Sequence, residues 1–572
     1  MATTATEAQK PPRPKGWALL KLALRTRKSA CMLGFGFSSG LPYALLIGTV
    51  NAWLGDEKIK LATIGVLSWI GLAYSFKFLW SPLVDRMQLP GLDRMGRRKS
   101  WIFLCQGVMV AAICALALTD PVTNIGWFAV MAVIAALASA TQDVAIDAWR
   151  IDIADEVTPV ELLSPIYQFG YRCASIVGGA FALVLAARMS WPTVFLLMAG
   201  MIGLTMLVTL RAPDTERPEG GALQAELAEA GQMDPRMRGI ALTIVGVSWL
   251  WAVGSIGRFM TSALAVRPEG MKAPSASDFM KATGPWIVVA TVLVPLAVAA
   301  TMNWMRAHGH QVQARQDGVA SPVRVVMNHL YGALVAPLAE LAGRLGWGVL
   351  IIFGMILSYS LVYNVWSSFA FPFYLDYLHY TKDQVAFASK LFGIIMTMAG
   401  VSAAGYLFLR IGRLPTMLVG AILPILGNFI YADLAEGGRH IDAVGSFLLL
   451  PILVDWLGHF GGFTYDAKMT RLLLAIAAEN ISTGLAGAAF VAYVSGVVSR
   501  KYTAVQYALL SSLTFLIGSL GRGIAGEAFD TYGYATVFRW TAAVGLFAVV
   551  FVLLEWARVS RIKPVLGEDD KG

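Results

Sequence analysis

The sequence contains little charge for its length. Only 14% of its 572 residues are Asp, Glu, Lys or Arg, whereas 57% are hydrophobic and the mean hydropathy is +0.63. A soluble chain of this size could not bury so much apolar surface, because a single core stops growing beyond about 250–300 residues. Apolar runs of about 20 residues recur along the chain, as membrane-spanning helices require. The composition excludes a soluble protein and predicts an all-α polytopic membrane protein.

Cysteine and histidine are also scarce, with four and six residues respectively. The cysteines fall inside apolar segments and lack the spacing of a disulfide framework or a metal site. The sequence has no P-loop and no H-E-x-x-H motif. We therefore expect no catalytic residues, no metal and no cofactor. The net charge of +9 is carried by short loops between apolar runs, which indicates membrane topology rather than nucleic-acid binding.

The apolar runs predict fourteen spans, grouped six, two and six. Their expected ranges are 29–50, 62–80, 101–119, 126–149, 164–187, 191–210, 240–260, 284–303, 346–368, 385–409, 414–432, 472–498, 503–524 and 536–556. Basic residues gather before the first span, in the loop after the second and behind the last. Because basic loops stay on the inner side of a membrane, both termini are expected in the cytoplasm.

This grouping divides the chain into five parts. We expect a cytoplasmic arm (1–28), a six-helix bundle (29–210), a linker with two extra spans and a cytoplasmic amphipathic helix at 323–343 (211–345), a second six-helix bundle (346–556) and a cytoplasmic tail (557–572). Residues 444–457 are apolar but too short to span, so they are expected to be interfacial or re-entrant. Two related halves are the organisation of many secondary transporters.

The loop after the second span reads "PLVDRMQLPGLDRMGRRKSW". It resembles the D-R-x-G-R-R signature of the major facilitator superfamily, split by an insertion between Asp85–Arg86 and Gly96–Arg97–Arg98. We expect these residues to form a conformational gating loop in a fold of that superfamily. The alternative is a solvated basic loop that serves topology alone.

Ionisable residues inside the predicted spans are the candidates for function, because a charge at membrane depth is costly. Asp143 and Asp147 lie in "ATQDVAIDAW", one helical turn apart on one face. The others are Lys77 in "SFKFLW", Arg172 in "YQFGYRCAS", Lys390 in "FASKLFG", and Glu479 with Asn480 in "AIAAENISTG". These positions predict a buried polar site that draws on both halves.

A buried carboxylate that exchanges a cationic partner for a proton is what a proton-coupled carrier needs. We expect Asp143 to be the principal coupling carboxylate, with Asp147 adjusting its proton affinity and Lys77 as its charge partner. Glu479 is a second protonation candidate. The competing interpretation is that Lys77, Asp143, Asp147 and Arg172 form a structural ion-pair cluster that joins helices.

Long blocks of the sequence resemble the AmpG-type muropeptide permeases. The similar blocks are 36–54, 63–86, 96–101, 140–149, 479–513 and 521–542. The resemblance implies a proton symporter of the bacterial inner membrane that imports N-acetylglucosaminyl-anhydro-N-acetylmuramyl peptides, without a cofactor and as a monomer. Such import feeds peptidoglycan recycling and, in many Gram-negative bacteria, β-lactamase induction.

A cavity for such a substrate needs aromatic faces for sugar rings and cations or donors for carboxylates. Residues expected to bind it are Gln142, Tyr167, Gln168, Tyr171, Arg172, Lys390 and Asn480. A carrier of acetyl-coenzyme A, peptides or drugs remains the main alternative, because these proteins share the fold and the Q-D motif. A membrane enzyme and a channel are disfavoured by the missing motifs and by the number of spans in one chain.

Overall fold

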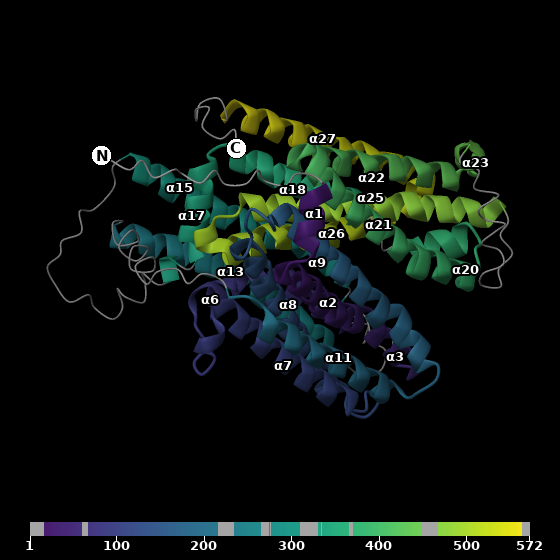
Figure 1. Ribbon diagram of the computed structural model, residues 1–572, viewed down its shortest axis with the longest axis horizontal. Helices are drawn as coiled ribbons and strands as arrows, with labels where there is room; N and C mark the ends of the chain where they lie inside the picture. The colour runs from purple at the N-terminus through teal and green to yellow at the C-terminus, as the bar shows by residue number, and fades with distance from the viewer. Residues whose placement is uncertain are drawn as a thin grey trace, which may run out of the picture.

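The computed structural model describes residues 17–59, 67–214, 234–264, 274, 276–308, 330–332, 334–364, 370–447 and 467–562. Every regular element in these residues is a helix, which agrees with the predicted all-α class. The helices form two groups that lie obliquely to each other, one drawn in purple to blue and the other in green to yellow (Figure 1). The α3 and α20 ends of the two groups are well separated in this view.

The first group begins with α1 (Trp17–Leu24) and ends with α11 (Trp191–Arg211). The label η marks 3₁₀ or π segments, several of which interrupt spans. Between these ends lie α2 (Arg27–Ala44), η1 (Leu45–Thr49), α3 (Val50–Asp56), η2 (Ser68–Gly71), α5 (Leu72–Phe76), η3 (Lys77–Leu79), α6 (Ser81–Arg86), η4 (Asp93–Met95), α7 (Arg97–Ala117), α8 (Ile125–Asp152), α9 (Val160–Ser175), η5 (Ile176–Phe181) and α10 (Ala182–Ala186).

Two further helical segments and a short helix follow before the second group. They are α13 (Pro235–Leu264), the α14–η6–α15 segment (Ala276–Val288, Val289–Leu293, Val294–Ala307) and α17 (Ala336–Leu345). The Trp249 ring of α13 meets the Phe78 ring of η3 edge-on at 5.5 Å, and α14 contacts α26 of the second group. The inserted helices therefore pack against both groups where these meet.

The second group runs from α18 (Gly348–Asn364) to α27 (Tyr534–Ile562). Between them lie α19 (Ala370–Pro372), η8 (Phe373–Tyr377), α20 (Lys382–Ala386), η9 (Phe387–Phe392), α21 (Gly393–Ile411), α22 (Arg413–Ala435), α23 (Arg439–Phe447), α25 (Ala467–Val497), η10 (Arg500–Tyr502) and α26 (Thr503–Tyr532). The predicted interfacial segment at 444–457 lies mostly outside the described residues, since only its first four residues are described, as part of α23.

Eleven helices in the described residues are long and apolar enough to cross a membrane, or twelve if α17 and α18, bent by 105°, count as one span. Large apolar side chains cover their outer faces, for example Leu250 at 74% exposure and Phe547 at 61%. Such a surface needs lipid rather than water around it. The chain is a multi-pass membrane protein. The finer count of fourteen stays a prediction, because the span at 62–80 lies partly outside the described residues.

Corresponding loops of the two groups share one backbone feature, a glycine with a positive φ angle directly before a helix. Gly96 precedes α7 with φ of 78°, and Gly412 precedes α22 with φ of 82°. Each is followed by an arginine at the first helical position, Arg97 or Arg413. Only glycine adopts such angles readily, so both turns depend on it. The shared turn supports the expected relation between the halves.

Candidate functional site

The two aspartates of the "ATQDVAIDAW" stretch lie in α8, and both are buried, at 8% exposure for Asp143 and 5% for Asp147. Asp147 has two cationic partners: its Oδ2 is 3.4 Å from Lys77 Nζ, and its Oδ1 is 3.1 Å from Arg150 Nη2. Asp143 Oδ1 has no hydrogen-bond partner in the described part of the chain. The predicted partner of Asp143, Lys77, thus pairs with Asp147 instead.

The position of Lys77 depends on an interruption of its helix. Lys77 opens the 3₁₀ segment η3, between α5 and α6, and its side chain is 6% exposed. A lysine this deep in an apolar layer is stable only when paired. The structure therefore brings together Lys77, Asp143 and Asp147, three of the four charges that the sequence places in the first half.

Arg150 is a member of this cluster that the sequence analysis missed. It is fully buried and lies three residues after Asp147 on α8. Its guanidinium lies over the rings of Tyr167 and Tyr507, 5.2 and 5.1 Å from their centroids. Residues three apart on a helix share a face, so the spacing alone could have indicated this pair.

Gln142 belongs to a buried polar network between helices. Its Oε1 accepts a hydrogen bond from Ser38 Oγ (3.1 Å), which in turn accepts one from Gln106 Nε2 (3.0 Å). Gln106 extends this network to α11, because it donates to Thr205 Oγ1 and accepts from Thr209 Oγ1. The network joins α2, α7, α8 and α11, and Gln142 Nε2 has no partner among the described residues. The expected role of Gln142 in substrate binding stays a prediction.

A chain of aromatic rings leads from α9 toward the second span. The ring centroids of Tyr167 and Tyr171 are 6.3 Å apart, those of Tyr171 and Tyr43 6.1 Å, and those of Tyr43 and Tyr74 5.1 Å. The Arg172 guanidinium lies 6.0 Å from the centre of the Tyr171 ring and is partly exposed. Gln168 is also partly exposed. This tyrosine row, with Arg172 beside it, offers apolar faces and a cation in one region.

The second group contributes a carboxyl and an amide. Glu479 Oε2 accepts a hydrogen bond of 2.6 Å from Tyr431 Oη, which lies 2.6 Å from Tyr374 Oη. Asn480 accepts a 2.9 Å hydrogen bond from Thr397 Oγ1 of α21. Lys390 lies in η9, but its side chain is outside the described residues. Tyr431, the hydroxyl partner of Glu479, could not be predicted, because it comes from a helix distant in the sequence.

The predicted gating loop joins the two groups. Arg98 is 2% exposed, and its guanidinium contacts Asp85 Oδ1 (2.8 Å) and Asp152 Oδ2 (3.0 Å) and donates to Thr503 Oγ1 (2.7 Å). The Asp85 carboxylate also accepts from the backbone N–H groups of Ala504 and Val505, at the start of α26. A carboxylate is stabilised at a helix N-terminus, where N–H groups lack partners.

The other residues of this loop support that contact. Arg97 donates through Nη1 to the Asp85 carbonyl, Gly96 sets the turn before α7, and Arg86 ends α6. We call the end of the molecule that carries Arg86, Arg97, Arg98 and Arg150 the basic end. A purely solvated loop would not be buried against the second group in this way.

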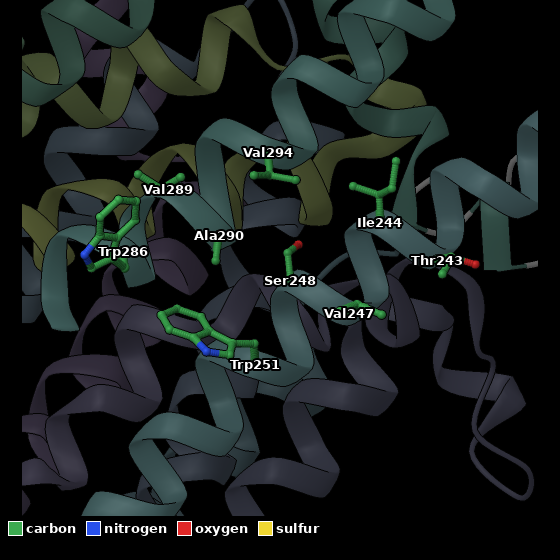
Figure 2. Close-up of a pocket in the computed structure, with 9 residues that line it drawn as sticks. All are labelled: Thr243, Ile244, Val247, Ser248, Trp251, Trp286, Val289, Ala290 and Val294. Carbon is green, nitrogen blue, oxygen red and sulfur yellow. The ribbon is translucent and has the colours of Figure 1, made fainter.

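An open groove lies apart from these residues, between α13 and the α14–η6–α15 segment. It has a volume of about 590 Å³, and Figure 2 shows Trp251 and Trp286 at one end and Thr243 at the other. The remaining lining is almost entirely apolar, and Trp286 is 63% exposed. A surface of this kind suits lipid, and its described lining has no cation for the carboxylates of a sugar–peptide substrate.

Comparison with known proteins decides the family. The family model described as Major Facilitator Superfamily matches residues 29–467. The chain belongs to the Major Facilitator Superfamily. A crystal structure of a double tryptophan mutant of XylE gives a TM-score of 0.51 at 12% identity, over 92% of this chain and 94% of that one. This likeness supports the superfamily fold alone.

Two curated relatives agree with this assignment. The anhydromuropeptide permease of Escherichia coli (strain K12) is 26% identical over 543 residues, which are 93% of this chain and 82% of the relative. The putative transporter AmpG 4 of Rickettsia felis is 25% identical over 523 residues, 91% of this chain and 94% of the relative. These matches confirm the resemblance to AmpG-type permeases. Membership of the superfamily also makes the chain a transporter rather than an enzyme.

Proposed function

We propose that this superfamily member imports anhydromuropeptides across the bacterial inner membrane together with protons, for peptidoglycan recycling and β-lactamase induction. In this proposal both termini and the basic end face the cytoplasm. The name of the Escherichia coli relative, which is similar over most of the chain, supports the substrate class. The positive-inside distribution of loop charges supports the orientation.

The buried aspartate pair of α8 is the observation that carries proton coupling. A charged side chain in the middle of a membrane costs about 2.5–3.5 kcal/mol or more, so such residues are retained for function. Asp147 is compensated by Lys77 and Arg150, whereas no ion pair holds Asp143 among the described residues. Burial favours the neutral carboxyl of Asp143, and a change in its surroundings during the cycle favours the charged one. Asp143 is therefore the group that loads and releases the proton.

The tyrosine row and Arg172 support a substrate with sugar rings and carboxylates. Aromatic faces bind the apolar faces of sugar rings, and arginine binds carboxylates with paired N–H donors. Tyr171 and Arg172 are adjacent and both partly exposed, so they offer the two kinds of contact side by side. Lys390 and Asn480 would add contacts from the second group.

Uptake by the full-length protein in proteoliposomes tests the substrate. We expect labelled anhydromuropeptide to accumulate when the outside is acidic, and we expect acetyl-coenzyme A in tenfold excess not to reduce that uptake. Labelled acetyl-coenzyme A, assayed by itself, should not accumulate. Liposomes without protein give the background. Accumulation of acetyl-coenzyme A in place of muropeptide would assign the chain to the alternative carrier class.

A further inference from the structure

One nitrogen atom at the basic end connects the aspartate pair to the second group. Arg150 Nη2 lies 3.1 Å from Asp147 Oδ1 and donates a 3.2 Å hydrogen bond to Ser495 Oγ of α25. The first contact stays within α8, and the second crosses between the groups. A single guanidinium therefore contacts both Asp147 of the first group and Ser495 of the second group.

The rings around Arg150 also come from both groups. Tyr167 belongs to α9 of the first group and Tyr507 to α26 of the second, and the guanidinium lies between them at 5.2 and 5.1 Å. Arg150 has no exposed surface, and its Nε and Nη1 have no hydrogen-bond partner in the described residues. This cation therefore depends on few partners, and Asp147 is the only charged one within ion-pair distance in the part of the chain that the structure describes.

We propose that Arg150 is a positioning residue that makes contact between the two groups at the basic end depend on the charge of Asp147. With Asp147 charged, the buried guanidinium is compensated and can remain between Tyr167 and Tyr507. With Asp147 neutral, the same guanidinium stays buried but loses its countercharge and keeps only neutral partners such as Ser495, Tyr167 and Tyr507. An uncompensated buried charge is strongly unfavourable, so the groups separate and Arg150 reaches water.

Other charged and titratable groups also lie near Asp147, and their contacts can be compared with those of Arg150. Lys77 of η3 shares the Asp147 carboxylate, and Asp143 lies one turn earlier on α8. Tyr167 and Tyr507 face the pair from α9 and α26. The segment η3 packs against α26, but the side-chain hydrogen bond that Lys77 makes in the described part of the chain is with Asp147, whereas Arg150 also donates one to Ser495 of the second group.

A second ion pair between the groups serves as the matched control. Arg413 Nη1 lies 3.8 Å from Glu161 Oε1, and both side chains are about one-third exposed, at 34% and 32%. Ion pairs this exposed contribute little because water screens them. The Arg413 pair bridges the two groups without involving Asp147, so its loss should leave the effect of Asp147 unchanged.

The test is a double-mutant cycle on the distance across the basic end. The four native cysteines are first replaced, and spin labels are attached at Met87→Cys and Lys501→Cys of the full-length protein. The distance between the two labels is then measured in nanodiscs without substrate. When Arg150 is present, Asp147→Asn should raise the ratio of molecules with separated helix groups to molecules with contacting helix groups by at least about fivefold. In an Arg150→Gln background Asp147→Asn should change that ratio less than twofold. In an Arg413→Gln background the full effect should persist.

An equal shift with and without Arg150, or no shift in either background, overturns the proposal. If Arg150→Gln is not recovered folded, Ser495→Ala replaces it, because it removes the hydrogen bond between the groups and leaves Arg150 in place; the other bond it removes, to the Val491 carbonyl, lies within α25. The Asp147→Asn effect should then fall by at least half, and an unchanged effect contradicts the proposal. The inference rests on the proposed function in that a proton enters the buried aspartate pair during transport, and it adds that Asp147 as well as Asp143 changes charge. The distances are measured without transport, so failure of proton-driven uptake leaves this test intact.

Discussion

At the residue scale, the sequence identifies which charges are buried but not how they are paired. Asp143, Asp147 and Lys77 were predicted to lie together because each interrupts an apolar run, and the structure brings them together. Their pairing depends on the 3₁₀ segment η3, which directs Lys77 to Asp147 rather than Asp143. Arg150 was missed because an arginine at the end of a span is usually read as a topology signal.

Arg172 provides a test of the substrate contact. Arg172→Gln should weaken binding of an anhydromuropeptide about 10- to 100-fold, because a charge-assisted hydrogen bond contributes about 1.5–3 kcal/mol. Binding of the disaccharide without its peptide should weaken less. Arg188→Gln, on an exposed arginine that follows α10 and donates to the Val184 carbonyl of that helix, is the control and should bind both ligands normally. Calorimetry on purified protein measures both affinities, and equal losses would favour a structural role for Arg172.

At the element scale, hydrophobic runs predict where helices lie but not how closely they approach or where they are interrupted. The extra pair expected at 240–260 and 284–303 corresponds to α13 and the α14–η6–α15 segment. The π segments η1, η5, η6, η8 and η9 were not predicted, because one extra residue in a turn barely changes an apolar pattern. Of the amphipathic helix expected at 323–343, residues 323–329 and 333 lie outside the described residues, and α17 covers its end.

Glycines set the closest helix contact of the first group. A Cβ atom on Gly170 of α9 would lie 2.2 Å from the Leu33 carbonyl oxygen of α2. Gly170→Ala should therefore destabilise the protein by about 1–3 kcal/mol, the usual cost of overpacking. Gly179→Ala, in η5 where a Cβ atom would meet nothing within 4 Å, should change stability by no more than about 0.5 kcal/mol. Thermal unfolding followed by tryptophan fluorescence compares them, and equal melting temperatures would contradict the close contact.

At the scale of the whole molecule, the two groups meet at the basic end through buried contacts from several elements. Asp85 and Arg98 join the first group to the start of α26, and Arg150 joins it to α25. The sequence indicated a gating loop through the superfamily signature, but its partners lie about 400 residues away in the chain. Such long-range partners cannot be read from local spacing, which is why the Ala504 and Val505 contacts were not predicted.

The predicted orientation of the molecule places this basic end in the cytoplasm. A cysteine at Leu330→Cys should react with an impermeant reagent only from the cytoplasmic side, and one at His440→Cys only from the periplasmic side. Both side chains are exposed, at 46% for Leu330 and 91% for His440, so reactivity depends on the side alone. Labelling of intact and permeabilised cells distinguishes the sides. Reaction of Leu330→Cys in intact cells would contradict the predicted topology.

Asp155, an acid outside the spans, provides a control that distinguishes proton coupling from general effects of pH on the protein. Partial burial opposes the charge of Asp155, but hydrogen bonds from Lys28 and Thr158 outweigh it and lower its pKa to about 2. Its contribution to stability is therefore present above its ordinary pKa of 3.8 and is lost only as the pH falls through about 2. Asp155→Asn should leave the pH profile of uptake unchanged between about pH 5 and 8. A shifted profile would mean that the loop takes part in coupling.

The most direct test of proton coupling is uptake driven by a pH gradient in proteoliposomes, with binding of the same muropeptide measured beside it. Asp143→Asn mimics the protonated carboxyl, so it should still bind the muropeptide but no longer concentrate it when the outside is acidic. Asp155→Asn, the control, should concentrate it as the unmodified chain does. If Asp143→Asn concentrates muropeptide against its gradient, Asp143 is not the coupling group and the aspartate pair is structural.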